Sequence, residues 1–122
     1  MTTSRRVPQE TGEPFARISV EEAKKLIDKG GVQVIDTRRP DEYVLGHVPG
    51  AKLIPVDEFF TRSGEVDSGK PALFICATGV RSALTCEMAA ALGFDASLLY
   101  NVEGGTEGWI ARSYPVKKGK DA

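Results

Sequence analysis

The chain has 122 residues, a formal net charge of −1 at pH 7, and 41% hydrophobic and 27% charged residues. This length corresponds to one domain, and the composition is ordinary for a soluble globular protein. The near-neutral charge gives no indication of nucleic-acid binding, and no apolar run approaches the ~20 residues that a membrane helix needs.

The predicted elements alternate between helices and strands. Ser19, with Glu22 three residues later, matches a capping box that begins a helix, and Gly30-Gly31 end it. Beyond this helix, short apolar or β-branched runs predict strands, and capped or periodic segments predict helices. In chain order they are strand 32–36, short helix 40–45, strand 52–54, short helix 56–61, strand 72–75, helix 81–92, strand 98–102 and helix 106–112.

Strands separated by helices predict an α/β fold with a central parallel sheet flanked by helices on both faces. Ligands of such sheets bind beyond the carboxyl ends of the strands. Asp36 and Cys76 each end a predicted strand, so we expect them on the same rim of the sheet. We further expect a flexible lead over residues 1–17, one domain over 18–116 and a flexible tail over 117–122.

The most informative segment runs from Cys76 to Ser82 and reads Cys-Ala-Thr-Gly-Val-Arg-Ser. It joins a buried strand to a helix, and Gly79 permits unusual backbone angles there. Backbone N–H groups at such a helix start can converge on an anion. The helix dipole and Arg81 both favour a thiolate, so we expect a lowered pKa for Cys76 and a catalytic role. The alternative is a buried cysteine that acts as a small hydrophobic residue.

Each of the other candidate residues also has a structural alternative. Arg81 is a cation at a helix N-terminus, which is unfavourable unless an anion lies between them. Asp36 and Arg38 are expected to form an ion pair that braces the loop, with a substrate contact of Arg38 as the alternative. His47 lies in a turn and is expected to be a hydrogen-bonded structural histidine rather than a general base. Cys86 lies among apolar helix residues and is expected to pack in the core, with a resolving thiol as the alternative.

The two cysteines form neither a disulfide framework nor a zinc ligand set. The first sixteen residues are polar and lack the apolar segment of a secretory signal. We therefore expect a cytoplasmic protein, in which Cys76 stays reduced and free to react.

Five short sequence segments, in this order along the chain, together form a pattern that is typical of a known family. The resemblance covers about residues 18 to 115. The segments are Val34-Ile35-Asp36-Thr37-Arg38; Glu42-Tyr43-Val44-Leu45-Gly46-His47-Val48-Pro49-Gly50-Ala51 with Ile54-Pro55; Cys76-x-x-Gly79-x-Arg81-Ser82; Gly93-Phe94; and Gly104-Gly105-x-x-x-Trp109. Together they resemble the rhodanese-like sulfurtransferase family in its single-domain form. Any one segment is a weak signal, but five in register are specific.

The resemblance implies a rhodanese-like α/β fold in which Cys76 carries a sulfane sulfur as a persulfide. It implies transfer of this sulfur from thiosulfate or a persulfide donor to cyanide or a thiol, without a metal or an organic cofactor. The donor and acceptor would be small molecules, or a thiol or persulfide protein, and neither nucleic acid nor membrane would be a partner. The substrate-binding residues would be Ala77, Thr78, Gly79, Val80, Arg81, Ser82 and Arg38, supported by Asp36 and His47.

Three features of the cysteine loop bear on the alternative functions. Four residues separate Cys76 from Arg81, one fewer than in the related phosphatases, and Ile75 precedes the cysteine where those enzymes have a histidine. Ala77 and Thr78 carry no positive charge, so we expect modest thiosulfate affinity and keep a persulfide as the alternative donor. A noncatalytic binding or regulatory module on the same fold is the rival interpretation, although such a module would need neither Cys76 nor Arg81.

Overall fold

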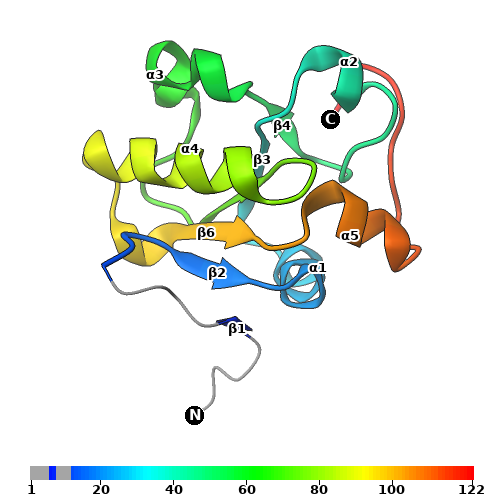
Figure 1. Cartoon of the computed structure of the whole chain (residues 1–122), viewed down its shortest axis with the longest axis horizontal. Coiled ribbons are helices and arrows are strands. Elements are labelled where there is room, and N and C mark those ends of the chain that lie inside the picture. Colours follow the sequence, from blue (N-terminus) through cyan, green and yellow to red (C-terminus); the bar gives the residue numbers. More distant parts are fainter. Residues whose placement is uncertain (1–5, 8–11) are drawn as a thin grey trace.

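A six-stranded sheet forms the centre of the fold (Figure 1). The structure is a computed structural model that describes the backbone of residues 6–7 and all of residues 12–122. The strand order is β1-β2-β6-β5-β3-β4, and every pairing is parallel except that of β1 with β2. The strands are β1 (Arg6–Val7), β2 (Ala16–Ile18), β3 (Gln33–Asp36), β4 (Lys52–Leu53), β5 (Ala72–Ile75) and β6 (Leu99–Val102).

Helices connect the parallel strands, close to the predicted positions. The Ser19 hydroxyl accepts a hydrogen bond from the backbone N–H of Glu22 at 3.1 Å, and α1 ends at Gly30, where φ is +87°. None of the helices in the described residues is long and apolar enough to cross a membrane. The helices are α1 (Val20–Lys29), α2 (Pro40–Tyr43), η1 (Val56–Glu58), α3 (Phe59–Arg62), η2 (Ser63–Glu65), α4 (Val80–Ala91), η3 (Ala96–Leu98) and α5 (Gly105–Ala111).

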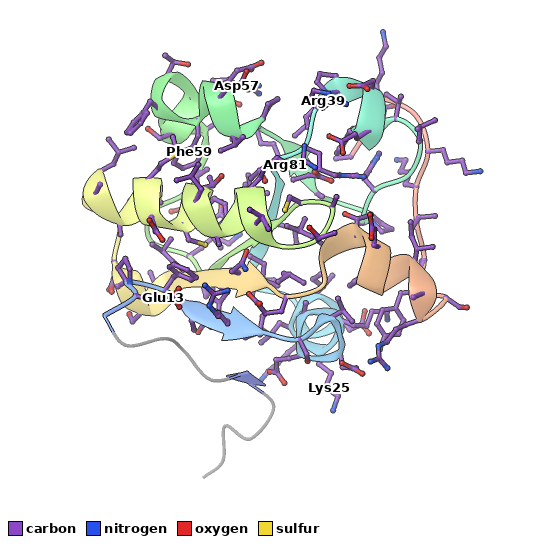
Figure 2. The ribbon with its side chains drawn as sticks, viewed as in Figure 1. Glu13, Lys25, Arg39, Asp57, Phe59 and Arg81 are labelled. Carbon is purple, nitrogen blue, oxygen red and sulfur yellow. The ribbon has the colours of Figure 1, made fainter. Side chains whose placement is uncertain are left out.

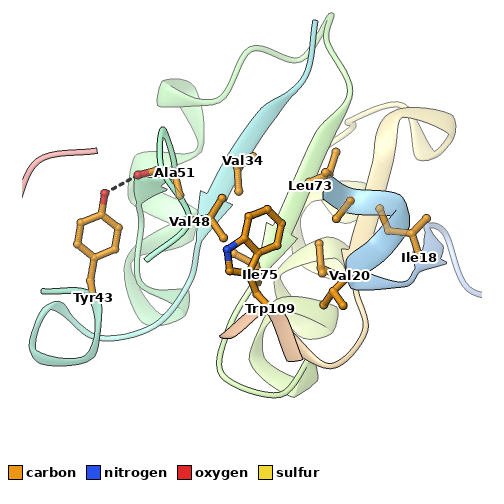
Figure 3. Packing of buried hydrophobic residues seen from close by; sticks show 11 residues of the cluster. Ile18, Val20, Val34, Tyr43, Val48, Ala51, Leu73, Ile75 and Trp109 are labelled. Carbon is orange, nitrogen blue, oxygen red and sulfur yellow. Dashed lines mark hydrogen bonds between the residues drawn. The ribbon is translucent and has the colours of Figure 1, made fainter. Parts of the chain in front are cut away.

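The sheet separates two hydrophobic clusters, because successive side chains of a strand point to opposite faces. Leu73 and Ile75 of β5 belong to one cluster, which also contains Trp109 from α5 (Figure 3). Phe74 belongs to the other cluster, where Phe59 from α3 and Cys86 from α4 cover the sheet. The α/β prediction, with a parallel sheet and helices on both faces, is therefore confirmed.

The strand β2 was not predicted from the sequence. It lies at the end of the segment that we expected to be a flexible lead, and it pairs with β6. Phe15 is buried beside it, and Arg17 forms ion pairs with Glu13 and Glu103. Residues 1–5 and 8–11 of the expected lead lie outside the described residues.

The C-terminal segment 117–122, which the sequence predicts to be flexible, lies against the turn that contains His47. Lys117 and His47 form a β-bridge, with backbone N–O distances of 2.9 and 2.8 Å. The His47 Nε2 atom lies 2.7 Å from the carbonyl oxygen of Asp121, and its Nδ1 atom lies 2.9 Å from that of Tyr43. The His47 ring also stacks on the Tyr43 ring, with centroids 3.6 Å apart. These contacts are those of a buried structural histidine.

Candidate active site

Cys76 lies at the carboxyl edge of the sheet, directly after β5. The register pairs Asp36 at the end of β3 with Ile75 at the end of β5. The backbone N–H of Thr37 then donates to the Ile75 carbonyl at 2.8 Å, which holds the two strand ends together. Asp36 and Cys76 therefore share one rim of the sheet, as the sequence predicts.

The loop after Cys76 folds back so that its donors face the sulfur. Gly79 adopts φ +108°, in the left-handed region that favours glycine, and its N–H donates to Cys76 Sγ at 3.1 Å. The Ser82 hydroxyl, in the first turn of α4, lies 3.4 Å from the same sulfur. Both Cys76 and Ser82 are buried, so these donors act on the sulfur with little screening by water.

These donors set the charge state of the thiol. Burial alone raises the pKa of Cys76, but hydrogen bonds from the Ser82 hydroxyl and from the backbone N–H groups of Ser82, Gly79 and Thr78 outweigh it. The net result is a pKa below the ordinary range, because these bonds favour the thiolate. Cys86 behaves oppositely, since burial in the apolar cluster raises its thiol pKa well above the usual value. Both cysteines are free, so no disulfide joins them.

Arg81 forms an ion pair with a carboxylate from another helix. Its Nη1 and Nη2 atoms donate to the two carboxylate oxygens of Glu42 in α2, at 2.7 and 3.0 Å. Figure 2 shows Arg81 at the start of α4, on the side toward α2. This bidentate pair lowers the pKa of Glu42 to about 2 and raises that of Arg81. The positive charge that the loop sequence predicts is therefore largely balanced by a carboxylate from another element.

Arg38 makes the contacts of a structural ion pair. Its guanidinium binds both carboxylate oxygens of Asp36, the shortest distance being 2.8 Å, and donates to the Gly46 carbonyl at 2.9 Å. The pair is almost fully buried. It braces the turn after α2, which contains Gly46, against the end of β3, and a substrate contact of Arg38 stays a prediction.

Several residues that the sequence analysis did not single out position the cysteine loop. Asn101 of β6 donates through Nδ2 to the Gly79 carbonyl at 3.2 Å. At the start of α5, the backbone N–H of Thr106 donates to the Cys76 carbonyl at 2.8 Å, and that of Glu107 to the Ala77 carbonyl at 3.1 Å. Two sequence signals could have identified these residues: the polar Asn101 within a buried strand, and the Gly-Gly pair at residues 104–105 just before Thr106.

Within residues 12–122, the structure contains no group of three or more His, Cys, Asp or Glu side chains that could hold a metal ion. The loop itself offers a cysteine sulfur that accepts hydrogen bonds from Gly79 and Ser82, and these bonds favour its thiolate form.

The lowered pKa of Cys76 predicts a measurable titration. Thiolate ultraviolet absorbance, taken as the difference between the wild-type protein and Cys76→Ser, should appear below the pH of about 8.5 at which an ordinary thiol titrates. The raised pKa of Cys86 keeps its own signal out of this window. A difference signal at or above the ordinary pH would mean that burial outweighs the loop hydrogen bonds.

The fold and the loop define a class: small α/β domains with a low-pKa cysteine between a central parallel strand and a helix. Residues 19–112 match the family model described as the Rhodanese-like domain. The chain therefore belongs to the rhodanese-like domain family.

Solved structures agree with this assignment. A rhodanese-related protein from Thermoplasma volcanium is 30% identical, with a TM-score of 0.76 and coverage of 84% of this chain and 98% of that one. A rhodanese-like domain protein from Staphylococcus aureus is 37% identical, with a TM-score of 0.69 and coverage of 76% and 89%. A thiosulfate sulfurtransferase from Pseudomonas aeruginosa is 25% identical, with a TM-score of 0.76 over 86% of this chain and 20% of that longer chain.

Proposed function

We propose that this protein is a sulfurtransferase that carries a sulfane sulfur on Cys76. In the first half-reaction, Sγ attacks the outer sulfur of thiosulfate, the sulfur–sulfur bond breaks, and sulfite leaves with the bonding electron pair. In the second, cyanide or a thiolate attacks the outer sulfur of the Cys76 persulfide, and the electron pair returns to Sγ. The persulfide is a covalent intermediate, so the kinetics are ping-pong.

One observation carries the proposal: the loop N–H groups and the Ser82 hydroxyl converge on Cys76 Sγ and lower its pKa. A thiolate is the form that attacks a sulfane sulfur, so no general base is required. The likeness to the thiosulfate sulfurtransferase from Pseudomonas aeruginosa supports the same chemistry. Neither a metal nor an organic cofactor enters these steps.

A panel of donors separates this proposal from its rivals. The protein is treated with thiosulfate, a low-molecular-weight persulfide or an aryl phosphate, and its intact mass is measured. A gain of one sulfur, followed by thiocyanate release on addition of cyanide, is the expected result. A noncatalytic module would gain no sulfur from any donor, and a phosphatase would release phosphate from the aryl phosphate faster than it forms thiocyanate.

The pair of Arg81 and Glu42 should set the affinity for the thiosulfate dianion. Glu42→Gln removes a negative charge beside Arg81 and keeps an oxygen to accept the hydrogen bond from the Arg39 backbone at the start of α2. We expect the Michaelis constant for thiosulfate to fall about fivefold at low salt. Arg81→Ala should raise it by more than that, because it removes a charge-assisted donor.

The matched control is Glu58→Gln, which breaks a comparable ion pair to Arg62 on α3. It should leave thiosulfate kinetics unchanged. If Glu42→Gln behaves like this control and Arg81→Ala is harmless, local charge does not govern donor affinity.

A further inference from the structure

Asn101 is a polar residue within β6, a strand of the buried parallel part of the sheet. Its side chain is fully buried. Strands that are covered on both faces are normally apolar throughout, so a buried amide at this position calls for a reason. The Asn101 amide nitrogen donates to the Gly79 carbonyl at 3.2 Å and also to the Glu103 carboxylate. One of its two contacts therefore lies on the cysteine loop.

Only one orientation of the Asn101 amide satisfies both neighbours. The Gly79 carbonyl and the Glu103 carboxylate are acceptors, and the amide NH2 group supplies two donors. The amide oxygen then faces the other way and has no hydrogen-bond partner among the described residues. Exchanging oxygen and nitrogen would place an acceptor against two acceptors, so the unpaired oxygen is a consequence of the two donated bonds. An aspartate offers no donor here at neutral pH, and a threonine offers one.

Gly79 transmits this contact to Cys76. Its N–H donates to Cys76 Sγ at 3.1 Å and its carbonyl accepts from Asn101, so the two peptide groups that meet at its α-carbon are each held at one point. Glycine is the most freely rotating residue, and Gly79 begins α4 without a side-chain cap. The backbone bond that its carbonyl accepts from Ala83 is long, at 3.3 Å. The Asn101 amide therefore restrains the direction of the N–H that faces the sulfur.

The Asn101 amide is itself held from the surface, between β2 and β6. Arg17 Nη1 donates at 2.9 Å to Glu103 Oε2, the same oxygen that accepts from Asn101. Arg17 and Asn101 are register partners on these strands, and Glu103 lies two residues beyond Asn101, so the three side chains lie on one face of the sheet. Figure 1 shows β6 between β2 and α4, the helix that begins at the cysteine loop.

We propose that Asn101 is a positioning residue for Cys76, and that Glu103 and Arg17 hold its amide in place from the edge of the sheet. Its importance for catalysis rests on the proposed function. Asn101 acts on the sulfur only through Gly79, whose N–H it keeps directed at Sγ. The readiness of Cys76 to react is thus set in part by a hydrogen-bonded chain that begins at the surface of β2.

This effect is one of geometry and is distinct from that of the surrounding charges. The Arg81 guanidinium attracts the Cys76 thiolate directly, and the variants below leave it in place. Glu103 carries a negative charge, so its removal would by itself favour the thiolate. A positioning role predicts the opposite sign. The charged side chains on the elements around the loop are Arg81 with Glu42, Arg38 with Asp36, and Glu107 on α5.

The titration of the Cys76 thiolate tests the proposal, measured for each variant against the same variant with Cys76→Ser. Asn101→Leu keeps the branched shape and removes the donors, so it should move the titration to higher pH. At a pH below the titration, sulfur loading from thiosulfate should slow about tenfold, as expected for one lost hydrogen bond to a charged group. Glu103→Ala should shift the titration in the same direction by less. Glu103→Gln keeps an acceptor for the amide and should shift it less than Glu103→Ala.

Two matched controls separate positioning from loss of stability. Leu99→Ala opens a space beneath a buried residue on the same strand and face, two residues before Asn101. It should lower the temperature of unfolding without moving the Cys76 titration. Glu58→Ala breaks a surface ion pair with Arg62 and should change neither. Equal titration shifts in Asn101→Leu and Leu99→Ala would show a general structural role and overturn the inference.

The Glu103 variants decide the question if Asn101→Leu fails to fold. A Cys76 titration in Glu103→Ala that stays in place or moves to lower pH overturns the inference, because charge alone would then account for the result.

The titration needs no turnover, so this inference and the proposed function can fail separately. Unchanged titration in both Asn101→Leu and Glu103→Ala, with normal thiocyanate formation, overturns the positioning role and leaves the sulfurtransferase proposal intact. A shifted titration in these variants, in a protein whose wild type gains no sulfur from any donor, supports the positioning role and overturns the sulfurtransferase proposal.

Discussion

Cys76→Ser should reduce sulfur transfer by more than about a thousandfold, whereas Cys86→Ser should retain most of it. A serine hydroxyl is neither a thiolate nor able to form a persulfide, although the same loop donors would surround it. Cys86 is fully buried in the apolar cluster between α4 and the sheet, and the raised pKa of its thiol keeps it protonated. Thiocyanate formation, with intact mass after thiosulfate treatment, measures both effects.

The Cys86 variant needs a control for stability, because serine places a hydroxyl in an apolar cluster. That change costs about 1–3 kcal/mol if the hydroxyl finds no partner. Cys86→Ala avoids the buried hydroxyl, and its activity should match that of the wild-type protein below the unfolding transition. Comparable loss in Cys76→Ser and Cys86→Ala would support a relay between two thiols, and full activity in Cys76→Ser would end the covalent mechanism.

The sequence predicted the parts of the site that depend on local structure. Strand 72–75, the loop with Gly79 and the helix after it follow from short-range patterns, and the convergence of loop N–H groups on Cys76 follows from them. The shared rim of Asp36 and Cys76 follows from the rule that parallel strands carry their ligands at the carboxyl edge. Predicting these features requires only the order and the type of the secondary-structure elements.

The features that sequence reasoning missed depend on how separate elements meet in space. Glu42 and Arg81 lie 39 residues apart, and their ion pair exists because α2 packs beside the first turn of α4. No local pattern shows that a carboxylate balances the arginine of the cysteine loop. The same holds for Thr106, because only the structure shows that its hydroxyl is buried and has no hydrogen-bond partner among the described residues. Neither contact could be predicted from a local sequence motif.

The close contact between α5 and the cysteine loop predicts that a side chain at Gly105 strongly destabilises the fold. Its φ is +59°, and a Cβ atom there would lie 2.5 Å from the carbonyl oxygens of both Cys76 and Ala77. Because these are backbone atoms of the candidate active site, the clash cannot be relieved by a side-chain rotation. Gly105→Ala should lower the free energy of unfolding by about 3–5 kcal/mol, from overpacking and backbone strain together. Thermal unfolding should then shift downward by about 15 °C.

Gly104→Ala is the matched control for this prediction. Gly104 also has a positive φ, +85°, but a Cβ atom there would meet nothing nearer than 3.9 Å. Only the conformational cost of about 1 kcal/mol should remain, and sulfur transfer should persist. The two variants share the same added methyl group and nearly the same backbone strain, so the difference in their stability isolates the contact of α5 with the Cys76 and Ala77 carbonyls.

Because the Thr106 and Glu107 N–H groups bind those same carbonyls, Gly105→Ala should also displace the loop and raise the pH at which the Cys76 thiolate forms. Equal stability and equal thiolate titration in both variants would show that the loop holds its geometry without close packing against α5.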